Sequence, residues 1–148
     1  MATYTSSVMA QQPRRVHAGA NVVWGTYSFG ATASSAGDIV FLAKIPHGAR
    51  VVDVRTDHSS GSTALGVSYG LATGTTTGGG ASYSAFIASG AQATNLYAAA
   101  GTLPFTVSVS DNDPNKYGIF TAKSESGTQT TSVVVNFRVT YTVDEQPG

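Results

Sequence analysis

The residues of this chain that could do chemistry gather in one stretch, KIPHGARVVDVRTDHSS, at residues 44–60. The stretch holds two of the three histidines, two of the eight acidic residues and three of the eight basic residues. An acid–base pair would need two titratable groups that converge on one substrate atom. Asp53, Asp57 and His58 would instead suit a metal site if all three converged and had supporting partners. Whether these side chains could act as an acid–base pair or as metal ligands therefore depends on the secondary-structure elements that carry them.

The first half of this stretch is predicted to be a strand, a tight turn and a second strand. Residues 38–44 form a mostly apolar run, and Pro46, which cannot donate to a β-ladder, ends it. The four-residue connection IPHG leads into a second run at residues 49–55. His47, between a proline and a glycine, is expected to be an exposed turn residue.

The acidic residues of the second strand have simple structural explanations. At a spacing of two, Asp53 is expected to share a face with Val51 and Arg55, as an Asp–Arg neighbour pair on a solvated or interface face. Asp57 and His58 are expected at the end of the strand, where Asx-type turn bonding accounts for the aspartate. We therefore predict no catalytic residue and no metal ligand in this stretch.

The rest of the chain has the pattern of an all-β protein. Short runs rich in β-branched and aromatic residues alternate with clusters of Gly, Pro, Asn and Ser, with turn signals every 8–12 residues or so. We predict an antiparallel β-sandwich of about eight strands, of jelly-roll type. One segment, residues 91–100, is instead predicted to form a helical turn or two. The predicted strands are residues 22–29, 38–44, 49–55, 65–71, 83–88, 105–110, 117–123 and 132–143.

The last of these runs carries the strongest signal. Its apolar and polar residues alternate with a period of two, and only Val134 breaks the pattern. Such alternation is typical of a strand with one face in a core and the other toward water. The face predicted to be buried consists of Val133, Val135, Phe137, Val139, Tyr141 and Val143.

The length and composition of the chain limit the classes of function that it can have. The 148 residues fit one domain, predicted at residues 21–148, after an extended or partly disordered N-terminal arm at residues 1–20. Charged residues make up only 11% and the formal net charge is +0, which argues against nucleic-acid binding. No apolar run is long enough to span a membrane, and a secretory signal is not expected. The absence of cysteine excludes disulfides and thiolate metal sites.

Sequence motifs of enzymes and cofactor sites are missing as well. Serine is abundant, yet no G-x-S-x-G elbow occurs. Residues 73–80 are rich in glycine, but no G-K-[ST] follows that would cradle a phosphate. We predict no enzyme activity, no catalytic residues and no cofactor.

The segment GDIVFLAKIPHGARVVDV (residues 37–54) and the ending VTYTVD (residues 139–144) resemble small structural proteins of tailed bacteriophages. In that family a similar sequence segment precedes several short β-strands and a last strand. The family comprises capsid decoration (cement) proteins and related head components, some of which are jelly rolls that assemble as trimers.

The resemblance implies a non-enzymatic virion protein that decorates and stabilises a phage capsid through multivalent protein–protein contacts. Its expected partners are the major capsid protein and further copies of itself, as a homotrimer, with no nucleic acid and no membrane. The expected location is the capsid surface, after assembly in the cytoplasm of the host bacterium. Candidate contacts to the capsid or to a neighbouring subunit are Arg14, Arg15, His47, Arg50, Asp53 and Arg55.

Two other functions remain open from the sequence. A carbohydrate- or receptor-binding β-sandwich of a phage tail or neck would need an exposed aromatic platform. A cupin-like metalloenzyme would need several histidines and a carboxylate that converge inside a barrel, whereas His17 lies in the predicted arm. The residues that could supply the aromatic platform are Trp24, Tyr27, Tyr69, Tyr83 and Tyr97.

Overall fold

The computed structural model describes residues 3–10, 19–29, 37–59, 66–73, 82–91, 95–97, 105–107, 117–126 and 133–143, and almost all of these lie in β-strands. The elements in chain order are β1 (Thr3–Thr5), the 3-10 turn η1 (Ser7–Ala10), β2 (Asn21–Phe29), β3 (Ile39–Pro46), β4 (Ala49–Ser59), β5 (Gly66–Thr73), β6 (Ser82–Ala91), β7 (Asn95–Tyr97), β8 (Phe105–Thr106), β9 (Tyr117–Ser126) and β10 (Val133–Val143).

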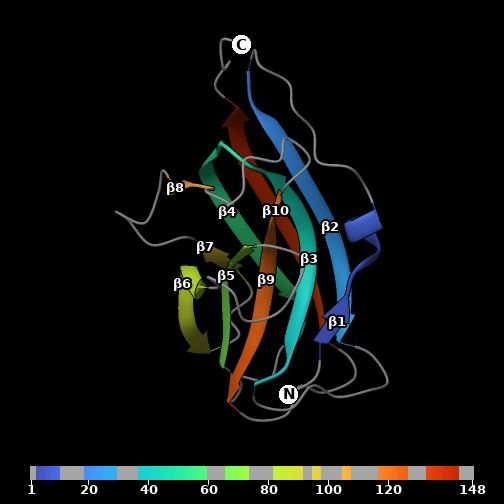
Figure 1. Ribbon diagram of the computed structural model, residues 1–148. Coiled ribbons are helices and arrows are strands. Elements are labelled where there is room, and N and C mark those ends of the chain that lie inside the picture. The colour runs from blue at the N-terminus through green and yellow to red at the C-terminus, as the bar shows by residue number, and fades with distance from the viewer. Residues whose placement is uncertain are drawn as a thin grey trace.

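The strands form two sheets that pack face to face (Figure 1). One sheet has the order β1-β3-β9-β5-β6, and the other has the order β2-β10-β4-β7, with β8 also paired to β4. The β1–β3 pair is parallel, and all the other pairs are antiparallel. The predicted all-β, two-layered architecture is confirmed.

One secondary-structure prediction is wrong. Residues 95–97, inside the segment predicted to be helical, form β7 and pair with Arg55, Thr56 and Asp57 of β4. Helix propensity is a weak preference, and pairing with a strand distant in sequence overrides it. Residues 92–94 and 98–100 of that segment lie outside the described residues.

The main core lies between the two sheets. Phe120 of β9 meets Phe137 of β10 across the sandwich, with ring centroids 5.9 Å apart, and Tyr69 and Phe86 extend the aromatic cluster. The alternation predicted for the last strand is confirmed at every position whose side chain is described. These buried residues are Val135, Phe137, Val139, Tyr141 and Val143.

Strand β3 is buried on both of its faces, which explains its continuous apolar sequence. Val40 and Leu42 belong to the main core, whereas Ile39 and Phe41 belong to a second cluster on the other side of the sheet. Met9 of η1 packs against this second cluster. The N-terminal residues therefore contribute to the covering of β3.

A β-bulge in β4 places Asp53 on the opposite face of the sheet from Val51, contrary to the prediction. Asp53 pairs with Thr140 and Val51 pairs with Tyr141, so Val52 has no opposite residue on β10. The extra residue reverses the phase of the alternation. Val51 is fully buried in the core and Asp53 lies on the outside, so the prediction that they share a face is wrong.

Asp57 and His58 lie near the end of β4, as predicted, because the strand ends at Ser59. His58 faces inward and is only 1% exposed between the sheets. Its Nε2 lies 2.6 Å from the hydroxyl oxygen of Tyr69, a buried hydrogen bond that joins the two layers. Burial raises the pKa of Tyr69, so this hydroxyl stays protonated at neutral pH.

Candidate interaction surface

The side chains of β2, β10 and β4 that point away from the core form one exposed sheet surface, here called the outer face. Each of the three strands alternates between buried or half-buried residues that face the core and more exposed residues that face outward. The outer face consists of Val22, Trp24, Thr26, Ser28, Asp53, Arg55, Asp57, Asn136, Arg138 and Thr140.

Trp24 dominates the outer face. Trp24 is 72% exposed, against 40% for Val22 on the same face. Strand register sets Trp24 opposite Arg138, and Arg138 opposite Arg55. Directly opposed residues on neighbouring strands project to the same side, so an indole and two guanidinium groups lie in one row.

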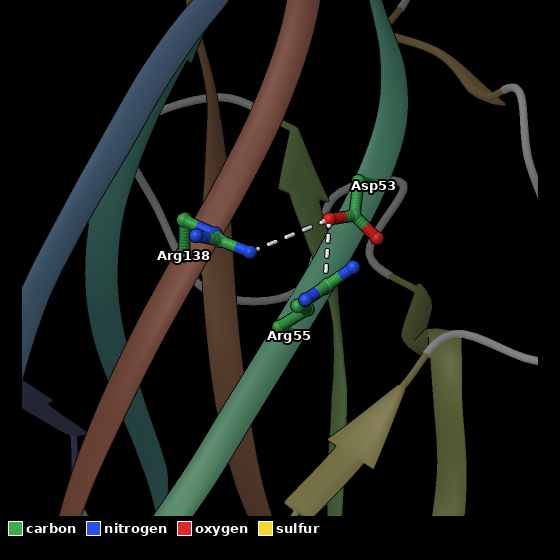
Figure 2. Close-up of polar contacts among 3 residues, drawn as sticks. All are labelled: Asp53, Arg55 and Arg138. Atoms are coloured by element: carbon green, nitrogen blue, oxygen red, sulfur yellow. Dashed lines mark ion pairs between the residues drawn. The ribbon is translucent and has the colours of Figure 1, made fainter.

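Asp53 joins the two arginines of this row (Figure 2). Its Oδ2 lies 3.0 Å from Nε of Arg55 and 4.0 Å from a terminal nitrogen of Arg138. All three side chains are substantially exposed, so water and salt screen these ion pairs, which contribute little to stability. The Asp53 carboxylate thus lies within ion-pair distance of both guanidinium groups of the row that includes Trp24.

The acidic residues and His58 of β4 do not form a shared site. Asp57 is exposed on the outer face whereas His58 is buried on the opposite side of β4, so they do not converge with Asp53 on a metal ion. No three His, Asp or Glu side chains within the described ranges are grouped as metal ligands. Aromatic and arginine side chains are, by contrast, enriched at protein–protein interfaces.

Three of the predicted contact residues lie on β4. Asp53 and Arg55 are brought together as predicted, with the addition of Arg138 from β10. Arg50 is exposed near the other end of the strand, where it pairs with Thr142 of β10. The structure therefore brings together two of the three, and Arg50 lies beyond the bulge.

The remaining predicted contacts lie elsewhere. His47 is half-buried in the β3–β4 turn, which Gly48 closes with a φ of 84°. The amide of Gly48 donates to the carbonyl of Val107 over 2.9 Å, which ties this turn to the end of β8. Arg14 and Arg15 lie outside the described residues.

Sequence reasoning missed Arg138 as a member of the site. The alternation of the last strand assigned it to the polar face, but only the pairing of β10 with β4 places it beside Asp53. Among the possible platform aromatics, Trp24 is exposed, Tyr27 is half-buried against the core and Tyr69 is fully buried. The side chains of Tyr83 and Tyr97 lie outside those described.

No helix among the described residues is both long enough and apolar enough to cross a membrane.

Comparisons with known proteins relate the fold to phage capsids. Neither a scan against protein-family models nor a search of curated proteins found a match. Among solved structures, a chain of the capsid of Ralstonia phage GP4 aligns with a TM-score of 0.74 at 12% identity, over 97% of this chain and 99% of that chain.

Two further structures are similar to this chain. A chain of the acidic stable capsid of Helicobacter pylori bacteriophage KHP30 aligns with a TM-score of 0.60 at 16% identity, over 89% of this chain and 94% of that chain. A chain of the cyanophage Pam1 capsid asymmetric unit aligns with a TM-score of 0.60 at 18% identity, over 93% and 96%. At these identities the comparisons establish a shared fold.

Proposed function

We propose that this chain is a structural protein of a phage virion, without enzyme activity, that decorates and stabilises the capsid. The observation that carries the proposal is the similarity to the Ralstonia phage GP4 capsid chain, which extends over nearly the full length of both chains. Fold similarity alone does not determine function. Two further neighbours from phage capsids and the phage-like sequence segment at residues 37–54 support the same role.

The proposed fold is a jelly roll, in which residues 21–148 make one domain and residues 1–20 an N-terminal arm. The strand order supports this topology. Without β1, the two sheets read β3-β9-β5-β6 and β2-β10-β4-β7, so the first and last long strands are neighbours inside one sheet. With the two-residue strand β8 also set aside, most successive strands lie in opposite sheets, as expected for the double Greek key of a jelly roll.

The outer face is the proposed contact surface for the major capsid protein. Its central row of Trp24, Arg138 and Arg55 has the residue types that dominate binding energy at interfaces. Arg50 and His47 extend the proposed contacts along β4 and its turn, and Arg14 and Arg15 of the arm would add to them. We propose a homotrimer at the capsid surface, assembled in the bacterial cytoplasm, because several linked contacts multiply a modest affinity.

A binding experiment tests the role and the surface together. Purified chain is titrated onto capsid shells that lack it, and bound protein is measured after sedimentation. Trp24→Ala is expected to weaken binding about 30-fold or more, the loss typical of an interface hot spot. Glu125→Gln, on the other sheet, is the matched control and should bind like the wild type. Absence of binding by the wild-type chain would refute the decoration role.

Counting copies in the parent particle provides an independent test. A cryo-electron microscopy reconstruction should contain hundreds of copies on the shell if the chain decorates the capsid. A dozen copies or fewer would assign it to the neck or tail and refute decoration.

One observation supports a second function, the binding of a carbohydrate or receptor. Trp24 is exposed on the edge strand β2 and offers the kind of flat apolar surface on which a sugar ring can stack. Tyr69 and Tyr27 face the core, so they do not extend this platform. A glycan array that gives a signal with the wild type but none with Trp24→Ala would favour this function over decoration.

A further inference from the structure

The N-terminal segment, residues 3–10, docks on the sandwich as a separate piece of chain. β1 adds a parallel strand to the edge of β3, with Thr5 opposite Phe41. The chain then turns at Ser6, whose amide donates to the Phe41 carbonyl over 2.8 Å and whose hydroxyl donates to the Leu42 carbonyl over 2.6 Å. Figure 1 shows β1 and η1 at the side of the sandwich where β2 and β3 lie.

Val8 is the apolar anchor of this segment. It is 8% exposed and belongs to the main core, although it lies in η1 and outside both sheets. Its amide donates to the Ser6 hydroxyl over 3.2 Å, which fixes the turn that directs the side chain inward. One short segment therefore combines strand addition to an edge with a buried side chain, the two features of peptide recognition by β-augmentation.

The receiving site, here called the socket, is built to admit Val8. It consists of the β3 edge at Phe41 and Leu42 together with Gly25 of β2 and Phe137 of β10. A Cβ atom at Gly25 would collide with Cγ2 of Val8 and would lie 3.0 Å from the ring of Phe137. All the socket residues belong to the sandwich and none to the segment, so a segment from any copy of the chain could fill it.

Ten residues connect the segment to the sandwich. Residues 11–20 join η1 to β2, and ten extended residues span up to roughly 33–36 Å. The formal net charge of +0 means that approaching copies of the chain carry no net Coulomb repulsion. Exchange of an identical element between protomers keeps every contact of the element and is a low-cost route to an oligomer.

We propose that the N-terminal segment is exchanged between copies of this chain, so that the Val8 of one copy occupies the Gly25 socket of a second copy. Each socket then remains filled, and the edge of β3 pairs with the β1 of a neighbour. The proposal concerns self-association and does not depend on the virion role.

Disulfide trapping tests the exchange directly, because the chain contains no cysteine. One chain carries Val8→Cys, and a second, tagged chain carries Gly25→Cys. The two are mixed, equilibrated and oxidised with oxidised glutathione. A tagged heterodimer linked through these two positions can form only between chains. The matched control replaces the second chain by Thr26→Cys, whose side chain is next along β2 but points to the outer face.

The expected result is a heterodimer yield about tenfold above the Thr26→Cys control, because docking holds the two thiols together at high effective concentration. A single chain with both Val8→Cys and Gly25→Cys reports docking within one chain. If that chain cross-links internally while the mixture stays at the control level, the segment docks only in its own chain and the proposal is wrong. If neither cross-links, the segment does not occupy the socket and the proposal is also wrong.

A second measurement avoids any change in the socket. An isotope-labelled Val8→Asp chain, whose own segment cannot dock, is titrated with unlabelled wild-type chain and followed by nuclear magnetic resonance. The amide signals of Gly25, Phe41 and Leu42 should shift. Unlabelled Val8→Asp chain should leave them in place. Equal spectra in the two titrations would contradict exchange.

Discussion

The effects of substitutions at Val8 and Gly25 on the free energy of unfolding should be coupled. The side chain of Val8 occupies the space into which a Cβ atom at position 25 would project. Val8→Ala removes two methyl groups from a buried position, at about 0.8 kcal/mol each, and leaves a small cavity, for a total cost of about 2 kcal/mol. Gly25→Ala inserts a Cβ that collides with Val8, and overpacking of this kind costs about 1–3 kcal/mol.

The double variant should cost much less than the sum of the two single variants. Once Val8 is shortened to alanine, its Cγ2 is gone and the new Cβ at position 25 occupies part of the cavity. Only the contact with the ring of Phe137, 3.0 Å away, remains tight. We expect a double-variant cost of about 2 kcal/mol against a sum of about 4, which is a coupling of about 2 kcal/mol.

Equilibrium unfolding in urea, followed by far-ultraviolet circular dichroism, measures the four free energies. Fluorescence of Trp24 is a poor probe because that side chain is already largely exposed in the folded state. Thr26→Ala serves as the matched control, since its side chain lies on the outer face and should show no coupling with Val8. Costs of Val8→Ala and Gly25→Ala that add to within about 0.5 kcal/mol would refute the packing argument.

Three further predictions concern the core and the outer face. Burial raises the pKa of Tyr69 above its ordinary value of 10, so its stabilising contribution is complete below pH 10 and is lost as the pH rises further. Tyr69→Phe should lower the free energy of unfolding by about 1 kcal/mol at pH 7. In urea unfolding at rising pH, the wild type should lose about 1.4 kcal/mol of this free energy per pH unit more than the variant. Parallel pH profiles would contradict this. Asp53→Asn should change the free energy of unfolding by less than about 1 kcal/mol, and the change should be smaller in high salt. A larger loss that does not depend on salt would mean that the ion pairs of Asp53 are not screened. Gly118→Ala should destabilise by about 1–3 kcal/mol, because its Cβ would lie 2.8 Å from Val107 and 3.0 Å from Leu71, and an unchanged urea midpoint would disprove that close packing.

Local patterns in the sequence were sufficient to predict the class of fold. The alternation of the last strand predicted which side of β10 is buried, because a period of two follows from strand geometry alone. The Asp53–Arg55 pair was predicted for the same reason, since both residues lie on one strand two positions apart. The low charge and the missing motifs guided the expectation of a binding or structural role, which remains a proposal.

The bulge in β4 marks the first limit of such reasoning. Nothing in the run ARVVDVR indicates that Val52 is the extra residue, because a bulge is defined by the partner strand. The alternation therefore predicted the wrong face for Asp53 relative to Val51. Beyond the bulge the same strand continues to His58, whose burial depends on a hydroxyl from Tyr69 in the opposite sheet.

The sequence by itself determined the β-strand content, the inward face of the last strand and the neighbour pair on β4, because these depend on residues a few positions apart. Only the tertiary structure decided the row of Trp24, Arg138 and Arg55, the His58–Tyr69 contact and the fit of Val8 against Gly25. Each of these joins residues that are distant in the chain. Strand order and register bring them together, and no local periodicity encodes that pairing.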